Sequence, residues 1–414
     1  MRQYEEEYTE EYEERPRRRR SPGALLVMIV LGLAIVVVLV VTYVRKKTTY
    51  TSWETAAEYP GIPGASCLKT TNGFVLYNND GAEGHAADGK VTWKISYEFG
   101  TPIAAVGGDF AAFADKGKTE VHVTGGDGSN NVINVAGKVA GLCVAGQGVT
   151  AVRTDDGDSD HIYLYDISGA MLLDIRTEVR KSGFPVTMAL SPDGRKLVTS
   201  YIKAGQTQES WVTFYNFGDV GQNYSDKIVG SYSFKDDLIP DVRFLGNERV
   251  LVTGPTGSIL YKFREVPEEM KKYSGDGVLA SVTGGAEGFI LAREQNTGIR
   301  LITLYDINGS EQMKIETGVS YDSLLSAGGE LIITSGDACI IYRKDGREKF
   351  RAKMKDTIEL MYPTGTKATY TVVEENSVEV IRLTTESQQE KAAQETIPDE
   401  AVEPQTEEPD TQLE

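Results

Sequence analysis

A repeat of about 40 residues runs through most of this chain and constrains its fold more than any other feature. Each copy contains short β-rich runs that are separated by Gly-, Asp- or Asn-rich turns about every 8–12 residues. Three turn glycines, Gly89, Gly128 and Gly169, are 39 and 41 residues apart, and Gly309 and Gly346 are 37 residues apart. The 140 residues between Gly169 and Gly309 have room for three longer copies. A period near 40 with four strands per copy is typical of a β-propeller.

The number of copies predicts the number of blades. We count eight copies, which predicts an all-β propeller of seven or eight four-stranded blades over residues 65–385. The last copy lacks an obvious fourth strand, so the ring has either eight blades or seven with the two ends sharing one. Pairing of the first and last strands would close the ring and leave no open sheet edge. A large β-sandwich is the alternative fold, but sandwiches do not keep one period over about 300 residues.

Two turns resemble those of known propeller repeats. Residues 88–93, DGKVTW, are similar to the quinoprotein repeat, and residues 191–197, SPDGRKL, resemble the turn of WD40-like repeats. The layout of the chain resembles uncharacterised single-pass, membrane-anchored β-propeller proteins of low-GC Gram-positive bacteria, whose domain has no assigned activity. Quinone dehydrogenases with such repeats carry adjacent cysteines and a calcium site at the cofactor. The three cysteines here are isolated, so the resemblance implies the fold and no cofactor.

Residues 23–44 form an uncharged apolar run of 22 residues. As a helix, this run would be roughly 33 Å long, which is enough to cross the hydrocarbon core of a bilayer. The run is too long for the apolar part of a cleaved signal peptide, so we expect a transmembrane signal anchor. Five arginines between residues 15 and 20 closely precede the run, and three basic residues follow it. This balance favours a single-pass protein of the cell membrane with a cytoplasmic N-terminus and an extracytoplasmic propeller.

The remaining segments differ in composition. Residues 1–22 form a head of acidic and basic residues that we expect to be disordered, and residues 45–64 are expected to form a stalk. Residues 386–414 form an acidic tail, also expected to be disordered. The net charge of the chain is −18; the head contributes −1, the basic triplet after the span +3 and the tail −9, which leaves −11 for the propeller region. Such a region repels nucleic acid, so we expect no nucleic-acid partner.

One acidic loop is a candidate metal site. Asp156, Asp158 and Asp160 have the alternate spacing of a calcium-binding loop. The sixth and twelfth positions of this loop are His161 and Ile167, where a complete EF-hand loop has Gly and Glu. A solvated loop between two strands is therefore the alternative interpretation.

The histidines and cysteines give no clear site. His85, His122 and His161 lie in successive copies, four, six and eight residues before the turn glycine. Even offsets place them on one strand face at different depths, so we expect no shared metal. Cys67, Cys143 and Cys339 are expected to be small buried hydrophobic residues. The signatures of serine hydrolases, zinc proteases and phosphate loops are not found, so we identify no catalytic or cofactor-binding residue.

These features favour a binding or scaffold module at the cell envelope. Its partners would be the lipid bilayer, through the single span, and an envelope protein or glycan. The alternative is an envelope enzyme, a glycosidase, lyase or quinone-type enzyme, built on the same propeller. That alternative predicts two or more carboxylates with perturbed pKa values at the mouth of the central channel. Because no catalytic motif is found, we favour the binding module.

Overall fold

The computed structural model describes residues 22–157, 159–178, 183–203, 209–275, 278–283, 288–296, 298–365 and 368–385. The chain divides into two compact units, Met1–Thr49 and Tyr50–Glu414. The predicted head and the predicted acidic tail lie outside the described residues, except for Pro22 at the end of the head. Each unit is considered by itself below.

The first unit contains one helix, α1 (Pro22–Lys47), which covers the predicted span. Its large apolar side chains between residues 26 and 39 are exposed. Over the described part of the chain, no helix has both the length and the hydropathy that a membrane crossing requires. The predicted span therefore stays a prediction.

The second unit is an eight-bladed β-propeller, and each blade is a four-stranded antiparallel sheet. Blades 1 and 2 contain β2 (Ser66–Lys69), β3 (Gly73–Tyr77), β4 (Gly81–Ala86) and β5 (Val91–Ser96), then β6 (Pro102–Gly107), β7 (Phe110–Asp115), β8 (Glu120–Thr124) and β9 (Asn130–Asn134). Blades 3 and 4 contain β10 (Lys138–Val144), β11 (Thr150–Asp155), β12 (Ser159–Tyr165) and β13 (Met171–Glu178), then β14 (Phe184–Leu190), β15 (Lys196–Lys203), β16 (Glu209–Asn216) and β17 (Ile228–Lys235).

The other four blades have the same strand order. Blades 5 and 6 contain β18 (Asp241–Phe244), β19 (Arg249–Gly254), β20 (Gly257–Phe263) and β21 (Pro267–Ser274), then β22 (Val278–Thr283), β23 (Phe289–Asn296), β24 (Ile299–Tyr305) and β25 (Glu311–Thr317). Blades 7 and 8 contain β26 (Ser323–Ala327), β27 (Glu330–Ser335), β28 (Ala338–Arg343) and β29 (Glu348–Lys353), then β30 (Ile358–Pro363), β31 (Thr369–Glu374), β32 (Ser377–Thr384) and β1 (Ser52–Pro60).

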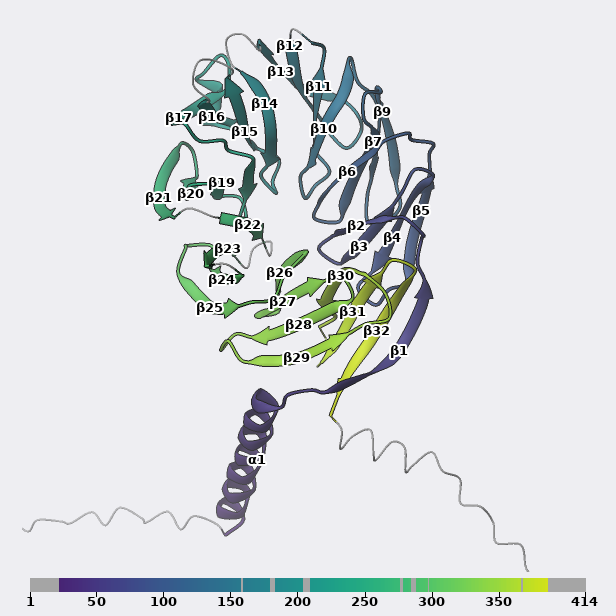
Figure 1. Cartoon of the computed structure of the whole chain (residues 1–414), viewed down its shortest axis with the longest axis vertical. Coiled ribbons are helices and arrows are strands. Elements are labelled where there is room, and N and C mark those ends of the chain that lie inside the picture. The colour runs from purple at the N-terminus through teal and green to yellow at the C-terminus, as the bar shows by residue number, and fades with distance from the viewer. Residues whose placement is uncertain are drawn as a thin grey trace, which may run out of the picture. The chain divides into compact units, whose positions relative to one another are not determined.

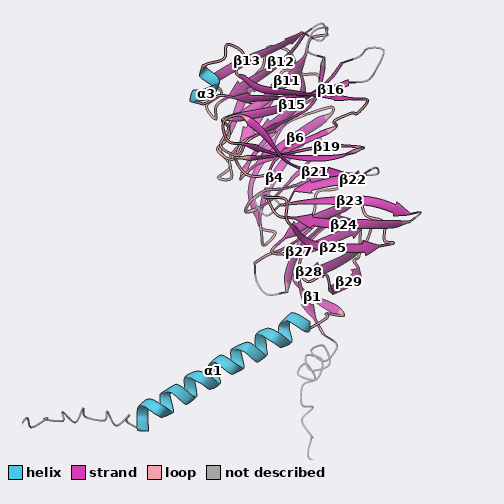
Figure 2. Cartoon of the chain, turned by 90° about the vertical axis from the view of Figure 1, so that its left-hand side faces the viewer, coloured by secondary structure: helices cyan, strands magenta, loops and turns pink. Residues whose placement is uncertain are grey.

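The blades follow one another around a ring, with the first strand of each blade nearest the central axis (Figure 1). The described part of this unit consists of strands joined by turns and loops, with one short helix in blade 4, α3 (Asp219–Gln222) (Figure 2). The predicted propeller is confirmed, and its uncertain blade number resolves to eight.

The ring is closed by β1, which is the outermost strand of blade 8. It pairs antiparallel with β32 from Ser52 opposite Thr384 to Pro60 opposite Ser377. The last copy has no fourth strand of its own, and β1, from the N-terminal end of the repeat region, takes that place in blade 8. The prediction of a stalk over residues 45–64 is wrong for residues 52–60, which form strand β1 of blade 8. In this position β1 pairs with the backbone N–H and C=O groups at the edge of β32, which would otherwise be open.

The hydrophobic core lies between the blades. Among the described residues, the buried hydrophobic side chains form eight clusters, one at each junction between neighbouring blades. At the junction of blades 4 and 5, for example, Phe214 is fully buried, and its ring centroid lies 5.2 Å from that of Phe263 in an edge-on contact. The middle strands are covered on both faces, which explains why the repeat contains apolar runs as well as alternating ones.

The turn glycines found from the repeat have the backbone conformation that their position requires. Their φ angles are 83, 83, 83, 79 and 77° at Gly89, Gly128, Gly169, Gly309 and Gly346 respectively. In blade 3, the N–H of Gly169 donates to the carbonyl oxygen of Asp166 at 3.0 Å, and the side chain of Asp166 accepts the N–H of Ser168. Glycine adopts positive φ without steric cost, so this residue closes a tight hairpin between the third and fourth strands.

Candidate functional site

One face of the propeller carries both kinds of turn described below and also the two ends of the chain segment that forms the ring. Turns between the first and second strands lie on one face of the ring, and so do turns between the third and fourth strands in blades 1 to 7, because neighbouring strands are antiparallel. The chain also enters β1 at Ser52 and leaves β32 at Thr384 on this face, since these two residues are paired. We call this the exit face.

A pocket of about 440 Å³ opens at the exit face where blades 7, 8 and 1 meet. We call it the closure pocket. Its walls come from the ends of strands and from four turns on this face. They are formed by Lys69, Thr71, Ala87, Ala327, Gly328, Glu330, Lys349, Tyr362, Pro363, Gly365, Ala368, Thr369 and Tyr370.

Lys69, the last residue of β2, supplies a positive charge at one wall of the closure pocket. Its Nζ donates hydrogen bonds to the carbonyl oxygens of Thr70 at 2.5 Å and Gly73 at 3.1 Å. The same atom lies 4.5 Å from the ring centroid of Tyr362, which is a cation–π distance. Among the ion pairs of the described residues, none includes Lys69. Burial lowers the pKa of this amine, and the charge of Asp109 opposes that effect.

The opposite wall contains a compact three-residue network. Lys349 Nζ lies 2.5 Å from Glu330 Oε1 and donates to Tyr370 Oη at 2.6 Å, and Tyr370 Oη donates to Glu330 Oε2. The side chains of Lys349 and Glu330 are 12% and 17% exposed, so both charges are largely removed from water. Burial raises the pKa of Tyr370 well above its ordinary value, and the Glu330 carboxylate raises it further. The network is internally neutral, so the net charge at the pocket wall comes from Lys69.

Blade 8 is also fastened directly to blade 1 beside this pocket. The carbonyl oxygen of Ala87 accepts hydrogen bonds from Tyr362 Oη at 3.2 Å and from Thr371 Oγ1 at 2.5 Å. On the other side, the backbone N–H of Tyr50 donates to the carbonyl oxygen of Lys349 in blade 7. The contacts that join blade 8 to its two neighbours therefore lie beside the pocket.

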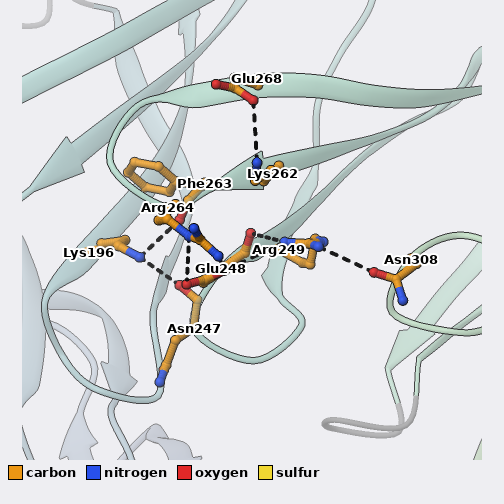
Figure 3. A network of polar contacts seen from close by, with 9 residues as sticks. All are labelled: Lys196, Asn247, Glu248, Arg249, Lys262, Phe263, Arg264, Glu268 and Asn308. Carbon is orange, nitrogen blue, oxygen red and sulfur yellow. Dashed lines mark hydrogen bonds and ion pairs between the residues drawn. The ribbon is translucent and has the colours of Figure 1, made fainter.

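A second polar network, on the exit face between blades 4, 5 and 6, has a structural role (Figure 3). Lys196 follows the SPDG turn of blade 4, and its Nζ donates to the carbonyl oxygens of Asn247 at 2.8 Å and Phe263 at 2.9 Å. Arg249 donates to the side chain of Asn308 in blade 6 at 3.3 Å. Burial lowers the pKa of Lys196, but both of its carbonyl partners are backbone groups of the next blade. This network fastens neighbouring blades together, and we do not assign it a ligand.

The predicted metal candidates do not come together in the described structure. Asp160 is 1% exposed and points toward blade 4, on the same side of β12 as Ile162, which packs on that blade. Asp156 is exposed, and its carboxylate lies beside Gly137, in the connection between blades 2 and 3. Asp158 lies outside the described residues. Within the described ranges, no group of three or more His, Cys, Asp or Glu side chains is arranged to hold a metal ion.

The three histidines lie at separate places. Their ring nitrogens lie 3.0, 2.8 and 2.7 Å from polar atoms of their own blades, His85 from Gly89, His122 from Glu120 and His161 from Asp174. For His85, burial lowers the pKa. The histidines therefore do not converge on one site.

The three cysteines are free thiols in three different blades. Burial is the largest cause that raises each of their pKa values, to about 12 at Cys143 and about 11 at Cys339, and above the ordinary range at Cys67. Such thiols stay protonated near neutral pH and are poor nucleophiles.

Within the described ranges, three carboxyl groups have raised pKa values, with burial as the largest cause: Asp160, Asp241 and Glu374. They belong to blades 3, 5 and 8. None of them is among the groups that shift the pKa of another. The charges of Asp155 and Asp156 also raise the pKa of Asp160, and the charge of Glu379 also raises the pKa of Glu374. Because the three groups belong to different blades, they do not form the cluster of perturbed carboxylates that the enzyme alternative predicts.

An exposed apolar tip lies on the third blade. Ile167 in the last turn and Met171 and Leu172 at the start of β13 are 42%, 59% and 55% exposed. We call these three residues the blade 3 tip. Single exposed apolar side chains are ordinary, whereas three large ones within one hairpin are a candidate surface for binding.

Comparison with known proteins identifies the family. The model of a family of unknown function, DUF5711, matches residues 45–383. The chain belongs to the DUF5711 family. Comparison with curated proteins gives no match.

Solved structures share the architecture of this DUF5711 protein. BamB from Moraxella catarrhalis is 13% identical with a TM-score of 0.52, and the match covers 80% of this chain and 98% of that one. A structure described as the eukaryotic initiation factor is 10% identical with a TM-score of 0.45, over 75% of this chain and 91% of that one. The likeness to BamB shows that the two proteins share the propeller fold.

Proposed function

We propose that this protein is a membrane-anchored, exported β-propeller that binds a partner protein at the cell envelope. The observation that carries the binding role is the blade 3 tip, where three large apolar side chains of one hairpin are exposed. Burying them against a partner would remove apolar surface from water, at about 25 cal/mol per Å². The anchor rests on the uncharged run at residues 23–44 and the basic residues that flank it.

Site-specific photocrosslinking in intact cells tests the binding role. A photoreactive amino acid replaces Met171, and the crosslinked partner is purified and identified. In a pull-down of the identified partner without crosslinking, the variant M171E/L172E should lose that partner, because two charges would then be buried in the interface. The matched control is V91E, which places a charge at an exposed apolar residue of blade 1, 44% exposed, and should keep the partner.

Retention of the partner by M171E/L172E would show that the blade 3 tip is not the binding surface. Recovery of no specific partner, together with turnover of a glycan by the purified protein, would favour the enzyme alternative. Protease added to intact protoplasts tests the topology, since an exported propeller is digested or released and a cytoplasmic one survives.

A further inference from the structure

The closure pocket has the chemistry of a small-ligand site that is separate from the blade 3 tip. Its volume of about 440 Å³ is within the range of sites for small molecules. The pocket is formed by blades 7, 8 and 1, whereas the tip belongs to blade 3. Binding in the pocket can therefore be tested independently of the proposed partner.

The charges of the pocket select the ligand. The Glu330 carboxylate already accepts from Lys349 and Tyr370, which leaves it little attraction for a cationic ligand. Lys69 has two backbone carbonyls and an aromatic ring around it, and none of the ion pairs of the described chain includes it. Its ammonium group carries three N–H donors, two of which are used by Thr70 and Gly73.

The walls around Lys69 suit a ligand with an apolar body. Ala327, Pro363 and Ala368 are apolar, and Thr71 adds a hydroxyl group near the charged wall. The turn at Gly328 has a φ of +61°, so a side chain here would be strained. We propose that the closure pocket binds a carboxylate-bearing small ligand, whose carboxylate accepts the third N–H of Lys69 and whose apolar body lies against the pocket walls.

A peptide C-terminus and a small organic acid both present this chemistry. Binding to the full-length protein is measured by calorimetry with two acids, acetyl-alanyl-alanine and benzoate. The controls are acetyl-alanyl-alanine amide and benzamide, which have nearly the same shape and no charge. Inorganic phosphate is the third probe. We expect at least one acid to bind and both amides to fail, and the acid that binds tells which source the pocket prefers.

Two variants separate the lysine from general charge effects. K69M should weaken binding of the acid about 10- to 100-fold, which is the range for losing one charge-assisted hydrogen bond. K116M removes an exposed lysine of blade 2 and should leave the affinity unchanged. In the wild-type protein, acetylation of Lys69 by a reactive ester, followed by mass spectrometry, should slow when the acid is bound and not when its amide is added. This measurement holds even if K69M does not fold.

Three results would overturn the proposal. The first is equal binding of acid and amide, and the second is binding of phosphate without either acid. The third is that neither acid binds to the wild-type chain or to a chain that ends at residue 385. The shorter chain is included because it lacks the acidic tail, whose carboxylates could otherwise compete for the pocket. None of these results bears on the blade 3 tip, so the proposed partner binding can stand or fail separately.

Discussion

We call the paired strands β1 and β32 the seam of the ring. Because the seam joins the two ends of the repeat, a disulfide bond across it should stabilise the protein more than a disulfide bond within one hairpin. Glu54 and Arg382 are directly opposite each other in the β1–β32 pair, and both side chains are exposed. Opposite Cα atoms in antiparallel strands are about 4.5–5.5 Å apart, which is within the range for a disulfide bond. The double variant E54C/R382C should therefore oxidise without moving the backbone.

The expected gain follows from the length of chain that the staple encloses. Residues 54 and 382 close a loop of 329 residues, counted inclusively. The loop-entropy relation gives a loss of unfolded-state entropy equal to about 6 kcal/mol at 25 °C. The control pair K138C/D155C joins two exposed charged residues opposite each other on β10 and β11 and closes 18 residues. The same relation gives about 3 kcal/mol for that loop.

Urea unfolding of each variant, oxidised and reduced, measures the difference. Trp53 lies on β1 itself, so tryptophan emission reports the seam. With an m-value of about 3 kcal/mol per M, oxidation should raise the midpoint by about 2 M for the seam pair and about 1 M for the control pair. The native thiols should not interfere with oxidation of the folded protein before urea is added, because burial raises the pKa of Cys143 to about 12 and that of Cys339 to about 11.

Equal shifts for the two pairs would refute this reasoning. Such a result would mean that the chain ends stay together in the unfolded state, or that β1 detaches before the ring unfolds. A lower midpoint on oxidation of the seam pair alone would show that the register of β1 and β32 differs from the one described.

Three further perturbations test individual features. Phe214→Ala should lower the free energy of unfolding by about 3–5 kcal/mol in urea titrations, because the ring is fully buried between two blades, whereas Phe214→Leu should cost less. Gly169→Ala should cost about 1 kcal/mol, since its φ is +83°, while Gly100→Ala should be nearly neutral because an added Cβ would meet nothing within 3.6 Å. Burial raises the pKa of Asp160 in the folded state, so this carboxyl destabilises the protein as pH rises above its unfolded pKa. The stability of the wild type relative to Asp160→Asn should therefore increase as the pH is lowered from 7 toward 4, and a pH-independent difference in urea midpoint would contradict this.

Much of the fold could be predicted because the repeat is encoded locally. Five of the eight copies place glycine where the last hairpin needs positive φ, and the apolar runs mark the middle strands that neighbouring blades cover on both faces. These signals are carried within about 40 residues and do not depend on how the ring closes.

The closing strand could not be recognised in the same way. Residues 52–60, SWETAAEYP, form an outermost strand whose side chains are half-buried or exposed, so the sequence has no strong apolar alternation. A shift of register between Thr55 and Ala57 breaks what alternation there is, and Pro60 ends the strand. The strand exists because the edge of β32 needs a partner, and that need is visible only in the closed ring.

The closure pocket was missed for a related reason. Lys69 and Tyr362 are 293 residues apart in the chain, and they become neighbours only because blades 1 and 8 adjoin. Neither residue is part of a recognisable motif. The acidic loop, in contrast, is conspicuous in the sequence, but alternation along the strands separates Asp156 from Asp160.

Closure by the first strand also sets the order of events during synthesis. Pro60 leaves the ribosome 317 residues before its partner Ser377, which corresponds to about 16 to 63 s at 5–20 residues per second. Throughout this interval β1 has no strand to pair with. A chain that stops before residue 377 would leave β1 unpaired permanently, with the backbone N–H and C=O groups of this strand lacking their partner strand.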